Sequence, residues 1–267
     1  MNKKIAIIGG GNLGTAIAEG LIQSGFVAPG HILITKRNLA TIHYLEEKGV
    51  LVSNDNAEAL RFADLVIIAV KPFQVNDVLS AVQPLFDENR HVLVSVITGI
   101  STAHIHGILN KKISTVRAMP NTAVAIQQSM TCISARDITS DQLSYVKELF
   151  EQLGKVVVIE EKLMEAATVL AACGTAYAMR YIRANIQGGI EIGFDAATAS
   201  LIAAQTVKGA AQLLLQKNTH PEQEIDKVTT PKGCTIAGLN EMEHQGFSSS
   251  LIKGIVASYD KIATDNK

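Results

Sequence analysis

The chain has 267 residues, of which 47% are hydrophobic and 18% charged, so it is long enough for one large domain or two ordinary ones with a sizeable core. A formal net charge of −1 offers no basic surface, and we expect neither nucleic acid nor a membrane as a partner. The apolar run Ile5–Ile8 is too short for a secretory signal, and no run approaches the roughly 18 apolar residues of a membrane span. The widely spaced cysteines Cys132, Cys173 and Cys234 favour reduced thiols and a cytoplasmic location.

The first 160 residues alternate short β-branched runs with helical patterns, which predicts a parallel, doubly wound α/β sheet. The run "LVIIAV" is apolar on both faces, as expected for a central strand covered by helices on each side. The predicted strands are 4–8, 31–35, 50–52, 64–70, 91–97, 114–118, 131–134 and 155–159. Between the first six of them, helices are predicted near 12–24, 38–48, 55–61, 74–83 and 101–109.

The sequence pattern changes after residue 161, and no further strand is predicted there. Helices are expected near 162–188, 195–217, 234–244 and 247–263, and several are rich in small residues. We therefore divide the chain into a sheet domain, 1–161, and an all-helical domain, 162–267. A domain of about 100 residues does not bury all of the apolar surface of such helices by itself. We therefore expect the helical domain to form a homodimer.

A glycine motif follows the first predicted strand. Gly9, Gly11 and Gly14 have the spacing G-x-G-x-x-G, and a predicted amphipathic helix follows. Such glycines permit a tight turn, close approach of the backbone to a pyrophosphate, and close packing of helix on strand. The pyrophosphate would lie at the helix N-terminus, at Asn12 and Leu13, where free N–H groups and the helix dipole favour an anion.

The end of the second predicted strand indicates which dinucleotide is bound. An NAD site keeps an acidic residue there for the ribose hydroxyls. This chain has Thr35, Lys36, Arg37 and Asn38 and no carboxylate. Cationic side chains suit a 2′-phosphate, so the sequence favours NADPH over NADH, although NADH stays possible.

Three further turns follow parallel strands and should face the same crevice, because ligands bind outside the carboxyl ends of the strands near the switch point of the sheet. Lys71 and Asn121 can supply hydrogen-bond donors to the cofactor, while proline and glycine fix the shapes of the loops. The three turns are Val70–Lys71–Pro72, Thr98–Gly99 and Met119–Pro120–Asn121–Thr122.

Several catalytic constellations are absent from the sequence. It contains no G-x-S-x-G elbow, H-E-x-x-H, C-x-x-C or Walker P-loop, and we predict no metal site. The seven histidines are scattered and are interpreted as structural or solvated. No general acid stands out, which favours a hydride transfer whose small-molecule substrate needs little help from a protein acid.

Six stretches spread over nearly the whole chain form a recognisable set: "IGGGNLGTAIAEGLI", "AVKP", "VSVITGIS", "RAMPNT", "CGTAYAMRYI" and, most specifically, "VTTPKGCTIAGLNEME". In these stretches the chain resembles the pyrroline-5-carboxylate reductase family. The resemblance implies a Rossmann-like domain followed by a helical dimerisation domain, with dimers often assembled into larger rings. It also implies NAD(P)H-dependent reduction of 1-pyrroline-5-carboxylate to L-proline, the last step of proline biosynthesis.

The stretch from Thr230 to Thr235 is then the predicted substrate turn. A turn that leads into a helix N-terminus presents free N–H groups to an anion, and the substrate carries a carboxylate. We expect the N–H groups of Gly233, Cys234 and Thr235 to hold this carboxylate. By resemblance, the Thr235 hydroxyl meets the imine nitrogen and is the catalytic group. The site would lie at the dimer interface, and positioning over the nicotinamide would supply most of the catalysis.

The chain departs from the family pattern at three positions. Thr175 stands where the family usually has proline, Ala123 follows the "MPNT" turn, and Lys232 replaces the first glycine of the substrate turn. If that turn position needs a positive φ, a lysine there costs roughly 1–2 kcal/mol. Lys232 could instead add a positive charge near the substrate carboxylate.

Two alternatives remain at this stage. A related imine or β-hydroxyacid reductase would share the architecture, but the hydroxyacid enzymes use a lysine in the first helix of the second domain. Residues 163–193 contain no lysine, and Arg180 and Arg183 are their only Lys or Arg side chains. The other alternative is a reductase-like regulator that binds NADP with lost or altered activity, which the changes at Thr175 and Lys232 motivate.

Overall fold

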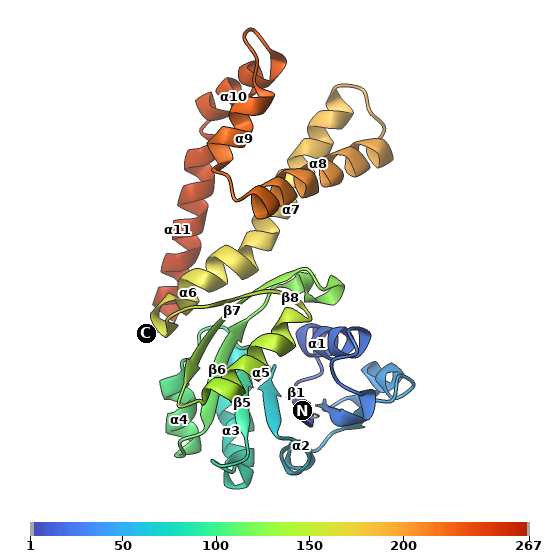
Figure 1. Ribbon diagram of the computed structural model, residues 1–267, viewed down its shortest axis with the longest axis vertical. Coiled ribbons are helices and arrows are strands. Elements are labelled where there is room, and N and C mark those ends of the chain that lie inside the picture. The colour runs from blue at the N-terminus through green and yellow to red at the C-terminus, as the bar shows by residue number, and fades with distance from the viewer. Residues whose placement is uncertain (1–2, 266–267) are drawn as a thin grey trace. The chain divides into compact units, whose positions relative to one another are not determined.

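The computed structural model describes residues 3–265 and contains an eight-stranded sheet in the order β3-β2-β1-β4-β5-β6-β7-β8 (Figure 1). Every neighbouring pair is parallel except β6 and β7. The predicted doubly wound sheet is confirmed, and all eight predicted strands are present. Their bounds are β1 Ile5–Ile8, β2 Ile32–Thr35, β3 Leu51–Ser53, β4 Leu65–Ile68, β5 Val92–Ser95, β6 Ser114–Met119, β7 Ser129–Arg136 and β8 Gly154–Val158.

Helices cover both faces of this sheet, because the central strands are apolar on both sides. One face packs against α1 (Asn12–Gln23) and α5 (Ser140–Glu151). The other face packs against α2 (Asn56–Phe62), α3 (Val75–Val82) and α4 (Thr102–Leu109). Two separate buried clusters result, and they hold the ends of the strands in fixed register.

The structure corrects the sequence interpretation at three places. Residues 38–48 form only two 3-10 turns, η2 (Leu39–Thr41) and η3 (His43–Leu45), rather than an α-helix. The helix α5 was missed, although Thr139 begins it with a capping box. The strand β7 runs antiparallel to β6 because the short turn after β6, with η6 (Thr122–Ile126), has no room for a crossover helix.

After β8, the described residues up to 265 are helical and contain no strand. After η7 (Glu161–Leu163) and α6 (Met164–Ala167), a π-helical turn at Thr168–Cys173 leads into α7. Contacts between residues divide the chain into two compact units. One unit runs up to Cys173 and also includes the stretch from Lys261, and the other is Gly174–Asp260. The division expected after residue 161 stays a prediction. The remaining helices are α7 Gly174–Glu191, α8 Ala196–Lys217, α9 Pro221–Val228, α10 Cys234–His244 and α11 Phe247–Asp265; α9 was not predicted.

Within the helical unit, few side chains are buried. Tyr177 and Ser258 share a hydrogen bond of 2.6 Å, and the rings of Tyr181 and Phe247 lie 6.1 Å apart. Large apolar side chains nevertheless stay in contact with solvent, among them Ile192 and Leu201 at 79% and 71% exposure. Such a surface is typical of a helical unit that associates with another chain.

Candidate functional site

The sheet brings five strand ends together at one edge. Thr35, Ile8, Ile68, Ser95 and Arg117 are partners in successive parallel pairs from β2 to β6. The turns that follow these strands are those selected from the sequence. The strand order reverses between β1 and β4, so the crevice of a doubly wound sheet lies beside the glycine motif and the turn after β4.

Each glycine of the motif has the conformation or the space that its predicted role requires. Gly9 has a φ of 116°, and a Cβ there would lie 2.5 Å from the carbonyl oxygen of Ala69. A Cβ on Gly14 would lie 2.1 Å from the carbonyl oxygen of Gly9, so only glycine lets α1 pack this closely. A Cβ on Gly11 would meet nothing within 4 Å. The open space beside Gly11 would let a ligand such as a pyrophosphate approach the backbone.

The amino end of α1 is left open to an anion. Gly11 caps this helix and has no side chain to accept the first N–H groups, and the first turn contains no acidic residue. Asn12 is exposed and Leu13 is partly exposed. By contrast, the caps of α4 and α8, Ser101 and Asp195, accept backbone N–H groups with their own side chains. The first turn of α1 therefore keeps donors for a ligand.

The end of β2 is tied to the glycine motif. The carbonyl of Thr35 accepts the N–H groups of Gly9 and Gly10 at 3.2 and 2.8 Å. The buried Thr35 hydroxyl donates to Asn56 Oδ1 at 2.6 Å and is not free for a cofactor. Arg37 is exposed and Lys36 partly exposed, so both can reach a phosphate. The sequence interpretation missed Asn56, which is the first residue of α2, three positions after the end of β3.

The turns after β4 and β6 differ in the hydrogen-bond donors that they leave for a ligand. Lys71 and Pro72 are exposed, and the Lys71 N–H donates to Gln74. The side chain of Asn121 is already engaged: Oδ1 accepts the Ala123 N–H at 3.0 Å, and Nδ2 donates to the carbonyl of Ala171 at 3.2 Å. Asn121 thus supports the turn and the π-helical segment, and one of the two N–H donors of its amide is left for the proposed contact with the cofactor.

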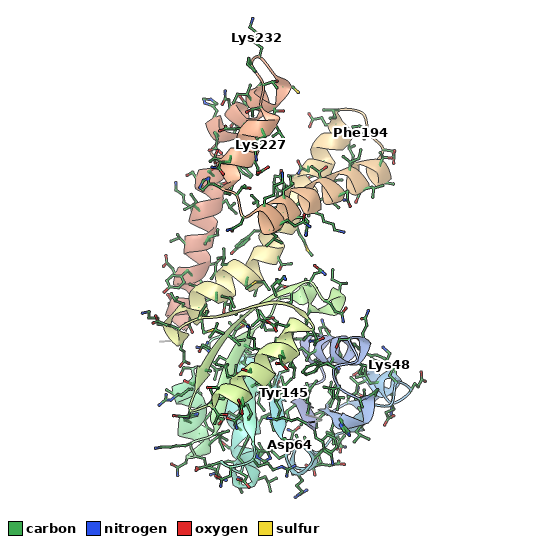
Figure 2. The ribbon with its side chains drawn as sticks, viewed as in Figure 1. Lys48, Asp64, Tyr145, Phe194, Lys227 and Lys232 are labelled. Carbon is green, nitrogen blue, oxygen red and sulfur yellow. The ribbon has the colours of Figure 1, made fainter. Side chains whose placement is uncertain are left out.

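The predicted substrate turn is a β-turn followed by a second open helix. The N–H of Gly233 donates to the carbonyl of Thr230 at 2.9 Å, with Pro231 and Lys232 at the centre of the turn. Lys232 has a φ of 61°, in the region that the third residue of a type II turn requires. Figure 2 shows Lys232 at the tip of this turn, between α9 and α10. The positive φ on which the predicted cost of this lysine depended is therefore present.

The donors of this turn are fewer than the sequence suggested. Because the Gly233 N–H is taken by Thr230, the free donors at the start of α10 come from Cys234 and Thr235, which are both exposed. Gly233 caps α10 without a side-chain hydrogen bond. A Cβ on Gly233 would lie 2.5 Å from the Thr230 hydroxyl and 3.0 Å from the Thr230 carbonyl oxygen, so a side chain at this position would displace the Thr230 hydroxyl.

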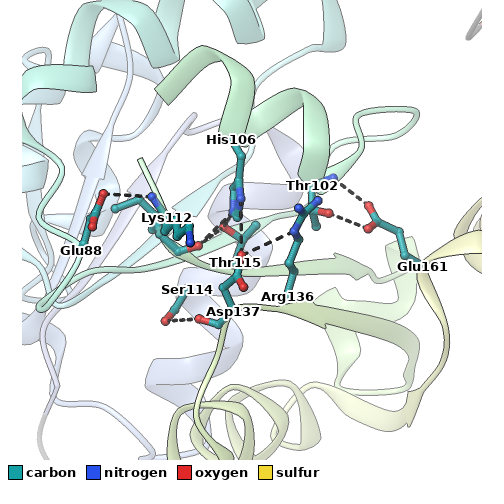
Figure 3. Close-up of polar contacts among 10 residues, drawn as sticks. Glu88, Thr102, His106, Lys112, Ser114, Thr115, Arg136, Asp137 and Glu161 are labelled. Atoms are coloured by element: carbon teal, nitrogen blue, oxygen red, sulfur yellow. Dashed lines mark hydrogen bonds and ion pairs between the residues drawn. The ribbon is translucent and has the colours of Figure 1, made fainter. Parts of the chain in front are cut away.

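A polar cluster at the opposite edge of the sheet has a structural role. His106 Nε2 contacts the carbonyl of Ile113 and the Thr115 hydroxyl, each at 3.0 Å, and Nδ1 lies 3.7 Å from Asp137 (Figure 3). These groups lie where β6 begins, away from the turns described above. Among residues 3–265, no group of three His, Cys, Asp or Glu side chains is placed to hold a metal, and no helix is long and apolar enough to cross a membrane.

Comparison with known proteins relates both halves of the chain to reductases. Residues 161–264 match the family model of pyrroline-5-carboxylate reductase dimerisation, and residues 4–99 match the model described as NADP oxidoreductase, coenzyme F420-dependent. The chain is 49% identical to pyrroline-5-carboxylate reductase 1 of Dictyostelium discoideum over 97% of its length, and it spans about half (49%) of that relative. It is 37% identical to the pyrroline-5-carboxylate reductase of Synechocystis sp. over 97% of each chain. The solved pyrroline-5-carboxylate reductase of Coxiella burnetii matches with a TM-score of 0.92 and 29% identity, over 99% of this chain and 98% of that one.

Proposed function

The chain belongs to the pyrroline-5-carboxylate reductase family, and we propose that it reduces 1-pyrroline-5-carboxylate to L-proline with NADPH, the last step of proline biosynthesis. One observation carries this proposal. The helices α1 and α10 both begin with a glycine cap that leaves first-turn N–H groups without a side-chain partner. The reaction needs two anion sites, one for the cofactor pyrophosphate and one for the substrate carboxylate.

The glycine motif fits the dinucleotide. Gly9 and Gly14 allow the tight turn, and Gly11 leaves space for the pyrophosphate at Asn12 and Leu13. The exposed Arg37 and the partly exposed Lys36 are proposed to hold the 2′-phosphate through charge-assisted hydrogen bonds. The remaining proposed contacts come from the backbone and side chains of the turns after β4 and β6, namely Val70, Lys71, Pro72, Met119, Pro120 and Asn121.

The turn before α10 is proposed to hold the substrate. The N–H groups of Cys234 and Thr235 receive the carboxylate, with Thr230 and the side-chain-free Gly233 shaping the turn. The Thr235 hydroxyl accepts a hydrogen bond from the protonated imine nitrogen, which fixes the orientation of the C=N bond. Bound NADPH supplies a hydride to the imine carbon, and the nitrogen keeps its proton, giving a secondary amine and NADP⁺. Orientation then supplies most of the catalysis.

The assembly and the compartment are also proposed. Residues 161–264 match a dimerisation model, and exposed apolar side chains such as Ile192 and Leu201 support a homodimer through the helical unit. Assembly of such dimers into a ring is a further proposal. A cytoplasmic location is favoured by the three cysteines, which form no disulfide.

Oxidation of NADPH on addition of 1-pyrroline-5-carboxylate to the purified protein tests this function. A Thr235→Ala variant tests the substrate turn, and Thr206→Ala, an exposed threonine on α8, is the matched control. We expect rapid turnover in the wild type and the control and a fall of about a hundredfold in Thr235→Ala. Tight binding of NADPH without turnover in the wild type would favour a regulator over a reductase.

A further inference from the structure

The carboxylate of Glu161 reaches across from η7 to the first residue of α4. Oε1 accepts the Thr102 N–H at 2.7 Å, and Oε2 accepts the Thr102 hydroxyl at 2.5 Å; Figure 3 shows both contacts. Thr102 is fully buried. First-turn N–H groups lack a partner within their helix and carry the positive end of its dipole, so the carboxylate is well placed there. Glu161 thus fixes the point where the turn after β5 ends.

A buried arginine holds the same carboxylate from the sheet. Arg117 lies on β6 with only 2% exposure, and its Nη1 lies 3.3 Å from Glu161 Oε1. Its Nη2 lies 3.3 Å from Glu165 Oε1, on α6. A buried guanidinium is costly unless it is paired, so the two glutamates are needed for Arg117 to stay in this position. Glu161 therefore joins α4, β6 and the segment that precedes α6.

The joined segments flank one half of the crevice. The turn after β5 contains Thr98, whose hydroxyl donates at 3.9 Å to the sulfur of Met119, the last residue of β6 before the next turn. Both turns lie beyond the switch between β1 and β4. The first half of the sheet carries the glycine motif and the pair Lys36 and Arg37, which are suited to bind the adenosine half of a dinucleotide. The second half consequently faces the nicotinamide.

We propose that Glu161 is a positioning residue for hydride transfer, because it holds the two turns that flank the nicotinamide ring. This inference rests on the proposed function. In this role Glu161 acts through Thr102 and Arg117, its partners in the structure. A small displacement of the ring from its reacting distance costs far more in rate than in binding, since most contacts of NADPH lie elsewhere.

The chain contains a matched control at the opposite edge of the sheet. Asp64 accepts the Lys4 N–H at 3.1 Å and Arg90 Nε at 3.2 Å, so it also joins a backbone N–H and an arginine. Its side chain is 38% exposed, against 34% for Glu161. Figure 2 labels Asp64 within the sheet unit, where it precedes β4. Loss of either carboxylate removes a contact to a backbone N–H and a contact to an arginine, but Arg90 is 41% exposed against 2% for Arg117, and only Glu161 lies beside the crevice.

Steady-state kinetics of Glu161→Ala, Glu161→Gln and Asp64→Ala test the proposal. In Glu161→Ala we expect kcat to fall about 10- to 100-fold with KM for NADPH nearly unchanged, and the kinetic isotope effect with 4-deuterated NADPH to rise. Glu161→Gln keeps an acceptor for Thr102 and should retain more of kcat, and it serves if the alanine variant does not fold. Asp64→Ala should lower the melting temperature and leave kcat unchanged. Equal kcat values for Glu161→Ala and wild type, or equal losses in Glu161→Ala and Asp64→Ala, would overturn the proposal.

A second readout needs no substrate and separates this inference from the proposed function. The fluorescence anisotropy of bound NADPH reports how firmly the reduced nicotinamide is held. We expect lower anisotropy in Glu161→Ala than in wild type and in Asp64→Ala at saturating protein. Wild-type protein that binds NADPH but does not reduce pyrroline-5-carboxylate would refute the function alone. Unchanged anisotropy in both glutamate variants would refute the role of Glu161.

Discussion

The N–H of Gly10 donates to the carbonyl of Thr35 at 2.8 Å. This bond ties the glycine turn after β1 to the end of β2, so Lys36 and Arg37 are held at a fixed distance from the open amino end of α1. A dinucleotide whose pyrophosphate lies at α1 therefore extends its adenosine ribose toward these two cations.

Replacement of both Lys36 and Arg37 by alanine should change cofactor preference. Each charge-assisted hydrogen bond to the 2′-phosphate contributes about 1.5–3 kcal/mol, so we expect KM for NADPH to rise at least roughly tenfold. KM for NADH should change little, because NADH carries no 2′-phosphate. Steady-state kinetics with both cofactors check this, and a parallel loss with NADH would contradict the assignment.

Two glycines of the motif should respond to alanine in opposite ways. In Gly14→Ala the new Cβ lies 2.1 Å from the Gly9 carbonyl oxygen, so α1 must shift and the protein should lose stability. In Gly11→Ala the Cβ meets nothing within 4 Å, so the fold should be retained while the methyl group occupies the ligand space. Thermal unfolding and NADPH titration of both variants separate the two roles. Full NADPH affinity in Gly11→Ala would place the pyrophosphate elsewhere.

Lys232 should lower the stability of the fold and raise the affinity for the substrate. Its φ of 61° is unfavourable for a side chain, so Lys232→Gly should raise stability by about 1 kcal/mol. The same change removes a positive charge from the turn before α10, and KM for pyrroline-5-carboxylate should rise a few-fold, most clearly at low salt. Lys232→Arg keeps both charge and backbone conformation and is the control, expected to match wild type in melting temperature and KM. An unchanged KM in Lys232→Gly would show that the charge has no part in binding.

Stability at acid pH should depend on Glu161. Burial alone would raise the pKa of this carboxyl, but the hydroxyl and N–H of Thr102 and the guanidinium of Arg117 outweigh burial and hold the pKa below its usual range. Glu165 of α6 also faces Arg117. Because the folded-state pKa is lowered, the stabilisation is full above the unfolded-state value and is lost as pH falls through the folded one. Denaturant unfolding from neutral pH to about pH 3 should show a smaller acid loss in Glu161→Gln. An identical pH profile would contradict this.

Much of the sheet could be predicted from the sequence, because buried parallel strands are short β-branched runs between turns. The run Leu65–Ile68 is one such strand. The helix predicted at residues 38–48 was wrong. Apolar side chains there have helical spacing, but the structure forms 3-10 turns around the buried Ile42 and Leu45. The antiparallel β7 was not predictable from its own residues, since the direction of a strand depends on the length of its connection.

The candidate site was predictable where backbone conformation selects the residue type. Gly9 and Gly14 are examples, because a side chain at either would overlap the backbone. Side-chain partners were not predictable. The Asn121 amide looked free for the cofactor but bonds to Ala123 and Ala171, which lies far away in sequence. The contacts of Glu161 were missed for the same reason, since Thr102 and Arg117 approach it only in the folded chain.

In the proposed reaction, a hydride passes from NADPH to the imine carbon of a substrate held at the turn before α10. The most direct measurement is the deuterium content of proline formed from 1-pyrroline-5-carboxylate and 4-deuterated NADPH of the reactive face, by wild type and Thr235→Ala. We predict one deuterium at the δ-carbon of proline with the wild type and a strongly reduced rate of labelled product in the variant. Absence of labelled proline with a wild-type protein that binds NADPH would contradict the proposed reaction.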